Sequence, residues 1–478
     1  MEWNKLLSEK RIRNFFVKPK TTERNNRTEL ERDYDRAVFS TPLRRMHDKA
    51  QVFPLEPNDS VRTRLTHSLE VSTVARDMAR AISRWLEKEN KIDEEQSRHI
   101  ETIAATCGLI HDLGNPPFGH AGEEAVAEWF KKQESNFFNF VGNSRRKKQL
   151  KNDFIKFNGN AQTLRLVSKL QILSDLYGLN FTCATMSAAC KYTASSDRID
   201  KNHEKKNFGY FASEELIVDL VRNETGTGES RNPITYIVEA ADDIVYSVGD
   251  LEDGVKKDVI AWEELKSKLM EYSEGDTELL GKCFKKAKLL IDKKDDRVEL
   301  KGKSRDEAMA KAFGIWAIGE AVHAVIETFN DKYESIMSGD YHKELFEDSR
   351  ACSLINACKE AGRKHVYCAE QNLKNEVMAR HVIHELMDIF WESASKGKGR
   401  RTRFEGKIYS LMSENYRNVF EKIESAPEPL PEYKSTYNKS RGNNTLPEKY
   451  CCMQLVADDI CGMTDTFATT LHRELTNG

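Results

Sequence analysis

Apolar residues recur at helical spacing along most of the chain, and only 11 prolines and 25 glycines interrupt them. The strict alternation that marks a half-buried strand is hard to find. The clearest helical pattern lies in segment 233–253, where seven apolar residues form one stripe with a period of 3.6 residues. The stripe consists of Ile234, Ile237, Val238, Ala241, Ile244, Val245 and Val248. The pattern predicts an all-α protein.

Two earlier segments are also predicted to be helical. In segment 61–79 the apolar residues Leu65, Leu69, Val74 and Met78 recur at roughly helical spacing. In segment 101–114 the residues Ile103, Cys107 and Ile110 predict a buried helix, which Gly114 and the following two prolines end.

The same pattern divides the chain into three parts. The length of the chain also allows about three domains. Residues 1–40 are charged and are expected to form a partly extended N-terminal extension. Residues 41–255 hold the candidate chemistry and are expected to form a helical core, and residues 256–478 an additional helical C-terminal region. Polar, turn-rich stretches predict loops at 141–152, 196–208, 222–233 and 424–447.

Composition describes a soluble globular protein with a charged surface. Hydrophobic residues make up 39% of the chain, charged residues 32%, and the net charge of -3 gives no global attraction to nucleic acid or anionic membranes. The chain has no apolar stretch of about 18 residues, so no membrane span is predicted. The N-terminus lacks the features of a signal peptide, and the ten cysteines form no CxxC pair. A cytoplasmic protein with reduced cysteines is expected.

Four metal-binding side chains stand within the predicted helices. His67 lies in the first, the His111-Asp112 pair at the end of the second, and Asp242 in the third. Two imidazoles and two carboxylates suit one divalent cation, with Mg²⁺ or Mn²⁺ expected and Fe²⁺ or Co²⁺ as alternatives. Adjacent helical residues point about 100° apart, so the pair can share an ion only if the helix end tips toward it. This set predicts metal-assisted hydrolysis.

The third helix carries a second line of polar side chains. Asp242, Tyr246 and Asp250 follow one another at i, i+4 and i+8, on a different face from the apolar stripe. Three hydrogen-bonding groups in a row on an otherwise apolar helix are typical of a site wall. The alternative is an ordinary solvated face.

Three long strings carry a resemblance to a known family. They are RTRLTHSLEV (62–71), LIHDLGNPPFGHAGEEA (109–125) and EAADDIVYSVGDLED (239–253). A lone His-Asp dipeptide is uninformative, but these strings in this order resemble the HD-domain deoxynucleoside triphosphate triphosphohydrolases of the bacterial dGTPase type. The resemblance covers most of the chain and is weakest at about 255–360 and 395–447.

The resemblance implies roles for the candidate residues. His67, His111, Asp112 and Asp242 match the family's metal ligands. His120 matches its catalytic histidine, and Glu123 the carboxylate that orients it. A histidine held by a carboxylate can move a proton near neutral pH. The alternative is that His120 only caps the helix that follows.

The resemblance also implies a nucleotide pocket. Phosphate contacts are expected from Arg64, Lys191, Tyr192 and Tyr246. Sugar contacts are expected from Gln51, Asp250 and Arg45, although Arg44 beside it is an equal candidate. Asn160, with Asn158 and Gln162, is expected to support the site, unless this segment is only a polar turn. Guanine contacts are expected from Glu376 in the C-terminal region. Lys191 could instead be an ordinary surface lysine.

Three functions compete at this point. The resemblance implies hydrolysis of dGTP, and of other dNTPs as a wider reading, to deoxynucleoside and inorganic tripolyphosphate, which controls dNTP pools. One alternative is another HD phosphohydrolase that acts on a nucleoside monophosphate, a cyclic dinucleotide or an alarmone. The other is a non-catalytic HD protein that binds nucleic acid.

The resemblance finally implies assembly and a regulatory partner. A homo-oligomer is expected, as a hexamer built from three dimers. Single-stranded DNA is an expected partner, through the basic runs at 144–151 and 396–403 and the nearby Tyr409. The alternative is that both runs are solvated loops.

Overall fold

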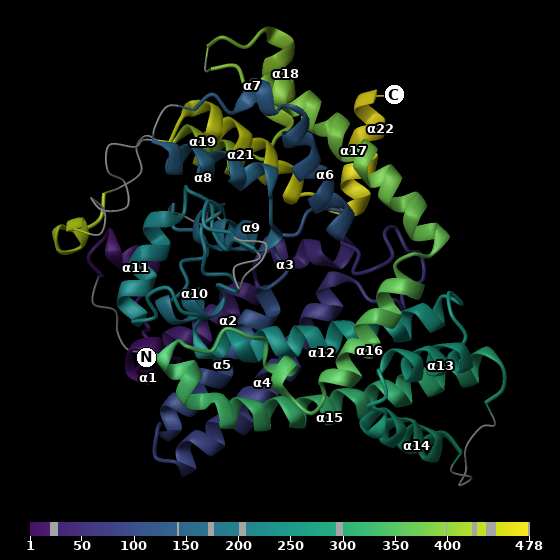
Figure 1. The fold of residues 1–478 in the computed structure, drawn as a ribbon. Coiled ribbons are helices and arrows are strands. Elements are labelled where there is room, and N and C mark those ends of the chain that lie inside the picture. The colour runs from purple at the N-terminus through teal and green to yellow at the C-terminus, as the bar shows by residue number, and fades with distance from the viewer. Residues whose placement is uncertain are drawn as a thin grey trace.

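The computed structural model is built of helices (Figure 1). It describes residues 1–19, 27–140, 143–170, 176–199, 207–292, 300–397, 399–422, 428–435 and 446–476. No β-strand occurs within these ranges, and extended pairing there is limited to three isolated bridges. The all-α prediction is confirmed.

The helices of the first half of the chain surround the segments that hold the candidate site. They are α1 (Trp3–Leu6), α2 (Glu29–Val38), α3 (Thr41–Arg45), α4 (Arg64–Lys88), α5 (Glu94–Ile110), α6 (Gly119–Lys132), α7 (Glu134–Phe137), α8 (Ser144–Ile155), α9 (Gly159–Arg165), α10 (Cys183–Ala188), α11 (Glu215–Thr225) and α12 (Pro233–Lys256). Short 3-10 or π segments are η1 (Ile12–Phe15), η2 (Met46–Asp48) and η3 (Leu166–Leu170).

The second half supplies longer helices that cover this core. They are α13 (Trp262–Tyr272), α14 (Glu278–Asp292), α15 (Lys303–Ser338), α16 (Cys352–Ala361), α17 (Glu370–Ala394), α18 (Arg403–Leu411), α19 (Glu414–Glu421), α21 (Glu448–Cys461) and α22 (Asp465–Thr476). The short segments are η4 (Leu345–Asp348), η5 (Gly362–Val366) and η7 (Pro431–Tyr433).

One helix is more apolar than the sequence pattern suggested. By length and composition alone, α15 is long and apolar enough to cross a membrane. More than half of its most apolar window is buried inside the protein, against α12, α14 and α4. A core helix passes the same test, so this helix is weak evidence of a membrane span.

Helices α4, α5 and α12 pack against one another and position the candidate site. The buried stripe of α12 is the predicted one, and all seven of its apolar residues are buried. The stripe predicted for α4 is partly wrong, since Leu69 is 47% exposed. The buried face of α4 carries small residues instead, because α5 approaches closely: a Cβ at Gly108 would lie 2.8 Å from the Ser72 Cα.

In its described residues the N-terminal extension combines the helices α1 and α2 and the segment η1 with extended stretches, one of which pairs Arg11 with Thr182. Trp3 and Leu6 are buried, and the Trp3 indole donates a hydrogen bond of 3.0 Å to the Tyr333 hydroxyl of α15. The Arg11 guanidinium donates at 2.8 Å to the buried Asp33 carboxylate of α2. The charged residues of this segment therefore pair inward, which a composition argument cannot detect.

Two of the predicted loops differ from the structure. The loop predicted at 141–152 is mostly helix α8, because Leu150 and Phe154 are buried one turn apart and Asn143 caps the helix at 2.8 Å. The loop at 222–233 is shorter, between α11 and α12. Residues 200–206, 424–427 and 436–445 of the other two predicted loops lie outside the described residues.

The C-terminal helices share an apolar core with the first half of the chain. Helix α17 packs on α6 and α21, and the side chains of these helices belong to one buried cluster with α8 and α9 (Figure 1). This packing brings α17 to one side of the candidate site. The division of the chain at residues 40 and 255 stays a prediction.

Candidate active site

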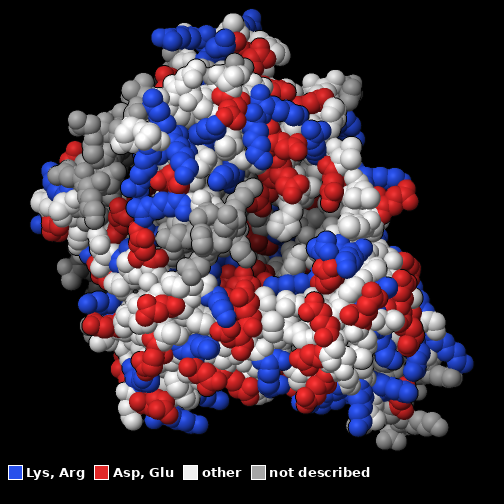
Figure 2. All heavy atoms as spheres, viewed as in Figure 1, with Lys and Arg blue, Asp and Glu red and all other residues white. Residues whose placement is uncertain are grey.

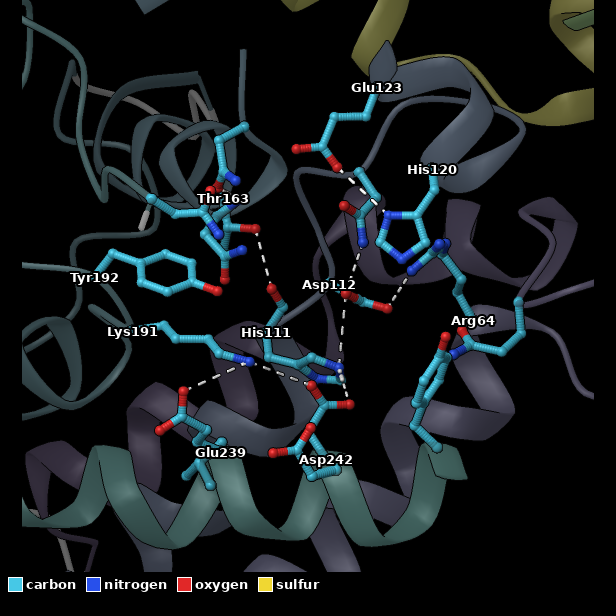
Figure 3. Close-up of a pocket in the computed structure, with 18 of the residues that line it drawn as sticks. Arg64, His111, Asp112, His120, Glu123, Thr163, Lys191, Tyr192, Glu239 and Asp242 are labelled. Carbon is cyan, nitrogen blue, oxygen red and sulfur yellow. Dashed lines mark hydrogen bonds and ion pairs between the residues drawn. The ribbon is translucent and has the colours of Figure 1, made fainter. Parts of the chain in front are cut away.

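A cavity of about 630 Å³ lies where α12, the end of α5, the start of α6 and α17 meet. Its volume is in the range that holds small-molecule ligands. Figure 3 shows side chains from α12, the end of α5 and the start of α6 that point toward a common space, with Asp242 and Glu239 on α12. On the face drawn in Figure 2, charges of both signs are interspersed, and acidic side chains border the hollow near its centre.

The four predicted metal ligands converge at one end of this cavity. The ligand atoms of His67, His111 and Asp112 lie within 4.8 Å of one another. The Asp242 Oδ1 atom lies 3.1 Å from the His67 Nε2 atom and 3.4 Å from the His111 Nε2 atom. The turn that follows α5 at Ile110 tips the His-Asp pair toward α12, as the punctuated sequence predicted.

The hydrogen bonds of His111 leave one ring nitrogen for a cation. Its Nδ1 atom lies 2.8 Å from the Gly108 carbonyl oxygen, which can only accept, so Nδ1 carries the proton. The Nε2 atom faces the Asp112 and Asp242 carboxylates and is buried without a hydrogen bond, and its proton would leave when a cation binds there. Burial alone would lower the pKa of His111, but Asp112 and Asp242 raise it to about 9. This donor set fits a divalent cation.

Two neighbours hold Asp112 in place. The Arg64 guanidinium donates a hydrogen bond to Asp112 Oδ2, and the Asn115 amide donates to Oδ1 at 2.6 Å. Burial alone would raise the pKa of Asp112, but Arg64 and His111 lower it to about 2. Asp112 is therefore an ionised carboxylate held in one orientation, as a metal ligand requires.

A tight turn places His120 at the mouth of the cavity. Phe118 precedes α6 in the left-handed backbone region, and a Cβ at Gly122 would lie 2.0 Å from the Pro117 carbonyl oxygen. His120 is 79% exposed, and its Nδ1 atom lies 3.7 Å from Glu123 Oε2. The Glu123 carboxylate raises the pKa of His120 above its ordinary value. Glu123 is itself held, because the Gly159 amide donates to it at 3.1 Å.

Cationic and acidic side chains meet on the other side of the metal ligands. The Lys191 Nζ atom lies 3.7 Å from Asp242 Oδ2 and 3.9 Å from Glu239 Oε1. Burial alone would lower the pKa of Lys191, but Glu239 and Asp242 raise it above its ordinary value. Lys191 is thus a fixed positive charge at the cavity, not an ordinary surface lysine.

The line of polar residues on α12 divides into two parts. Asp242 and Tyr246 line the cavity, whereas Asp250 is buried behind it and accepts a hydrogen bond of 2.6 Å from the Tyr367 hydroxyl. Tyr246 and Tyr367 stack with ring centroids 6.0 Å apart. Burial raises the pKa of Asp250 to about 8. The ordinary solvated face is excluded for this helix.

The cavity gathers most of the predicted site residues. Besides His111, Asp112 and Asp242, its lining includes Gln51, Arg64, His120, Glu123, Asn158, Asn160, Lys191, Tyr192, Tyr246 and Glu376. His67 lies just below it, 1% exposed.

Three of the candidate residues lie elsewhere. Arg45 donates at 2.9 Å to the Gly462 carbonyl oxygen, and Arg44 bonds within its own turn, so neither lines the cavity. Gln162 donates at 2.9 Å to the buried Asp458 of α21 rather than to the site. The sequence pattern does not show whether an arginine or a glutamine contacts a ligand or a distant helix.

Sequence reasoning missed three residues at this site. Asn115 holds Asp112, Glu239 pairs with Lys191, and Tyr367 covers Asp250. Glu239 could have been found, because it lies three residues before Asp242 on the same face of α12. Tyr367 follows the π segment η5 and carried no helical signal of its own.

Comparison with known proteins agrees with this geometry. The HD domain family model matches residues 64–168. A deoxyguanosinetriphosphate triphosphohydrolase-like protein of Listeria monocytogenes is 34% identical over 99% of both chains. A deoxyguanosinetriphosphate triphosphohydrolase of Yersinia enterocolitica is 32% identical over 93% of both chains. A deoxyguanosinetriphosphate triphosphohydrolase-like protein of Synechocystis is 30% identical over 99% of both chains.

Proposed function

From the premise that the chain belongs to the deoxyguanosinetriphosphate triphosphohydrolase family of HD-domain proteins, we propose that it is a metal-dependent dNTP triphosphohydrolase. We propose dGTP as its substrate, with deoxyguanosine and inorganic tripolyphosphate as products. The observation that carries this proposal is the convergence of His67, His111, Asp112 and Asp242 beside the His120-Glu123 pair in one cavity. Control of cytoplasmic dNTP pools follows from that activity.

The four ligands would hold the divalent cation, which supplies Lewis-acid polarisation of a phosphate oxygen when bound. In the reaction, water adds to the α-phosphorus and the bond from phosphorus to the 5′ oxygen breaks. His120 stands at the cavity mouth with its protonated form stabilised by Glu123, so it can donate the proton that the departing 5′ oxygen needs. Glu123 acts through His120 and is a positioning residue.

Fixed cations would bind the triphosphate. Lys191 is charged and lies beside Asp242, so it can meet a phosphate oxygen next to the metal ligands. The Arg64 Nε atom is buried without a hydrogen bond, while its Nη1 atom holds Asp112. Arg64 therefore ties the metal ligands to the phosphate pocket.

The stacked tyrosines beside Asp250 suggest where the deoxyribose lies. We expect Asp250→Ala to raise KM for dGTP several-fold and to shrink the preference for dGTP over its 2′,3′-dideoxy analogue, because the Tyr367 hydroxyl, which would meet the 3′ hydroxyl, loses the carboxylate that holds it. Since Asp250 is reached through the Tyr367 hydroxyl, Tyr367→Phe should shrink the same preference. Steady-state kinetics with both substrates measures this, and an unchanged ratio in both variants rules out the sugar role.

We propose that Glu376, which lines the cavity from α17, meets the base. Gln51 stays the candidate for the sugar, and its buried Oε1 atom makes no hydrogen bond with the residues that the structure describes. A carboxylate accepts hydrogen bonds, and the guanine edge offers N–H donors, so Glu376 supports a preference for guanine.

A substrate panel tests the proposed function. The protein is incubated with each dNTP and rNTP in Mg²⁺ or Mn²⁺, and nucleoside and phosphate products are identified. We expect deoxyguanosine and tripolyphosphate from dGTP. Stepwise release of orthophosphate, or hydrolysis of a cyclic dinucleotide or alarmone instead, would move the protein to another HD phosphohydrolase class. No turnover of any of these would support a binding protein.

We also propose a closed homo-oligomer, a hexamer by family resemblance. Light scattering coupled to size-exclusion chromatography measures the mass directly. A monomer at micromolar concentration contradicts this part of the proposal and leaves the hydrolase activity unaffected.

We also propose, from the family resemblance, that single-stranded DNA stimulates the enzyme. In the basic run 144–151, Arg145 pairs with Asp197 at 2.9 Å and Arg146 with Glu215 at 2.9 Å. Tyr409 is buried, and the Arg401 guanidinium covers its ring at 3.5 Å, so it is not free to stack on bases. Binding and dGTP turnover across a salt series decide the matter, and no binding at low salt removes the claim.

A further inference from the structure

A second group of metal-binding side chains lies outside the cavity, between α17 and α22. His381 and Glu385 are one turn apart on α17, and His472 approaches from α22, which packs on α17 (Figure 1). The Glu385 carboxylate lies 3.1 Å from the His381 Nε2 atom and 2.7 Å from the His472 Nε2 atom. The two imidazole rings are 5.6 Å apart, and the three ligand atoms lie within 4.8 Å of one another.

The chemistry of these three groups matches a particular class of cation. Two imidazoles and one carboxylate suit Zn²⁺ and similar transition metals, whereas Mg²⁺ and Ca²⁺ prefer oxygen ligands alone. Bonds of about 2.0–2.1 Å to a tetrahedral ion place ligand atoms roughly 3.3 Å apart. The present separations, from 2.7 Å to at most 4.8 Å, lie on both sides of that value, so small side-chain rotations would reach it. The adjacent His384 does not belong to the group, because its Nε2 atom faces the Ala125 carbonyl oxygen at 3.0 Å.

We propose that His381, Glu385 and His472 form a second metal site that binds a Zn²⁺-class cation and ties α22 to α17. Three protein ligands leave one position for water. The site is separate from the cavity ligands in residues and elements.

A cation at this second site would stabilise the edge of the cavity. Asp465, the first residue of α22, accepts hydrogen bonds from the amides of Ala50 at 2.9 Å and Phe118 at 2.8 Å. Phe118 begins the turn that carries His120, and Glu376 precedes His381 on α17 by five residues. A cation between the two helices therefore stabilises the backbone that positions His120 and Gln51, without touching the substrate.

Metal counting on the full chain tests this site. Chelator-treated protein is dialysed against micromolar Zn²⁺, and bound zinc is measured for the wild type and for His381→Ala and His472→Ala. We expect each variant to lose one zinc per chain. His381 is 67% exposed, so its substitution leaves the fold intact even if that of the more buried His472 does not. The matched control is His323→Ala on α15, an exposed histidine away from both sites, which should bind as the wild type does.

Two further measurements separate this site from the cavity. Asp112→Ala, which removes a cavity ligand, should keep the zinc that His381→Ala loses. Zn²⁺ should slow hydrogen exchange of the α22 amides in the wild type and in His323→Ala, but not in His381→Ala. Equal zinc stoichiometry and equal α22 exchange in the wild type and in both site variants would overturn the proposal, and His381, Glu385 and His472 would then be a hydrogen-bonded contact only.

Discussion

Two buried clusters of charged side chains join distant parts of this chain, and they differ in how completely their polar atoms are paired. In the first, Arg165 of α9 donates to the Asp458 carboxylate of α21 from Nε at 2.8 Å and from Nη2 at 2.7 Å. Its Nη1 atom donates to Glu214 at 2.9 Å, and Lys169 also pairs with Glu214. Every nitrogen of this guanidinium has a protein partner.

The cavity cluster is built of the same kinds of residues but is incomplete. The buried atoms Arg64 Nε, His111 Nε2, Gln51 Oε1 and Glu239 Oε1 make no hydrogen bond with any residue that the structure describes. Leaving a buried polar atom unpaired costs about 1–3 kcal/mol. The residues that carry these atoms line the cavity, whereas the Arg165 cluster is enclosed by packed helices.

This difference distinguishes a buried polar cluster that stabilises the fold from one that binds a ligand. A buried cluster whose members satisfy one another stabilises the packing of α9 and α21, and needs nothing else. A cluster whose unpaired atoms converge on open space is explained by ligands that complete it, here a cation and a nucleotide.

The largest expected effect comes from removing a cavity ligand. We expect Asp112→Ala to lower kcat by more than about 10³-fold, because loss of the cation removes several kcal/mol of transition-state stabilisation. Bound metal should fall while circular dichroism still shows the helical content of the wild type. Near-normal turnover in metal-depleted Asp112→Ala protein would show that the cavity cluster is as structural as the other.

For the Arg165 cluster we expect a loss of stability rather than a loss of activity. Asp458→Ala removes the partners of Nε and Nη2 and leaves the buried Arg165 guanidinium with Glu214 and the Ser213 hydroxyl on Nη1 alone, so we expect the free energy of unfolding to fall by about 3–5 kcal/mol. Turnover per folded molecule should stay close to that of the wild type. Urea unfolding and active-site-normalised kinetics test both parts. Unchanged stability with lost activity would show that the Arg165 cluster is functional rather than structural.

A smaller effect is expected for the proton donor. His120→Ala should lower kcat by roughly 10²-fold, the usual size of a general-acid contribution, with no loss of bound metal. Because His120 is exposed, the free energy of unfolding should not change. A variant with normal kcat would reduce His120 to a helix-start residue.

The smallest effect is expected for its positioning partner. Glu123 raises the pKa of His120, and a general acid is active below its pKa, so activity falls as pH rises through that value. Glu123→Gln removes the cause of the raised pKa. The alkaline limb of the kcat/KM profile should therefore move to lower pH, with a loss of about tenfold or less at neutral pH. A shift confined to the acidic limb would instead make His120 a general base.

Local patterns predicted the parts of this molecule that depend on neighbouring residues. The apolar stripe of α12 and the Gly-Pro end of α5 follow from spacing, and they place the candidate ligand Asp242 on α12 and the His111-Asp112 pair at the end of α5, as the structure has them. The His120-Glu123 pair is likewise a contact three residues apart within one helix. Such contacts are fixed by helical geometry.

Long-range pairing decided the parts that spacing could not predict. Arg165 and Asp458 are 293 residues apart in the chain, and Tyr367 meets Asp250 across 117 residues. Arg45 and Gln162 resembled site residues but bond to the segment around α21. The helix α8 was hidden because its cations pair with acids on other elements, such as Glu215.

The position of bond cleavage tests the central claim most directly. Hydrolysis of dGTP in H₂¹⁸O, followed by mass spectrometry of both products, locates the oxygen that water supplies. Attack at the α-phosphorus beside His111 and Asp112 predicts one ¹⁸O atom in inorganic tripolyphosphate and none in deoxyguanosine. Label in orthophosphate with dGDP as the partner product, or label in the nucleoside, would contradict the account.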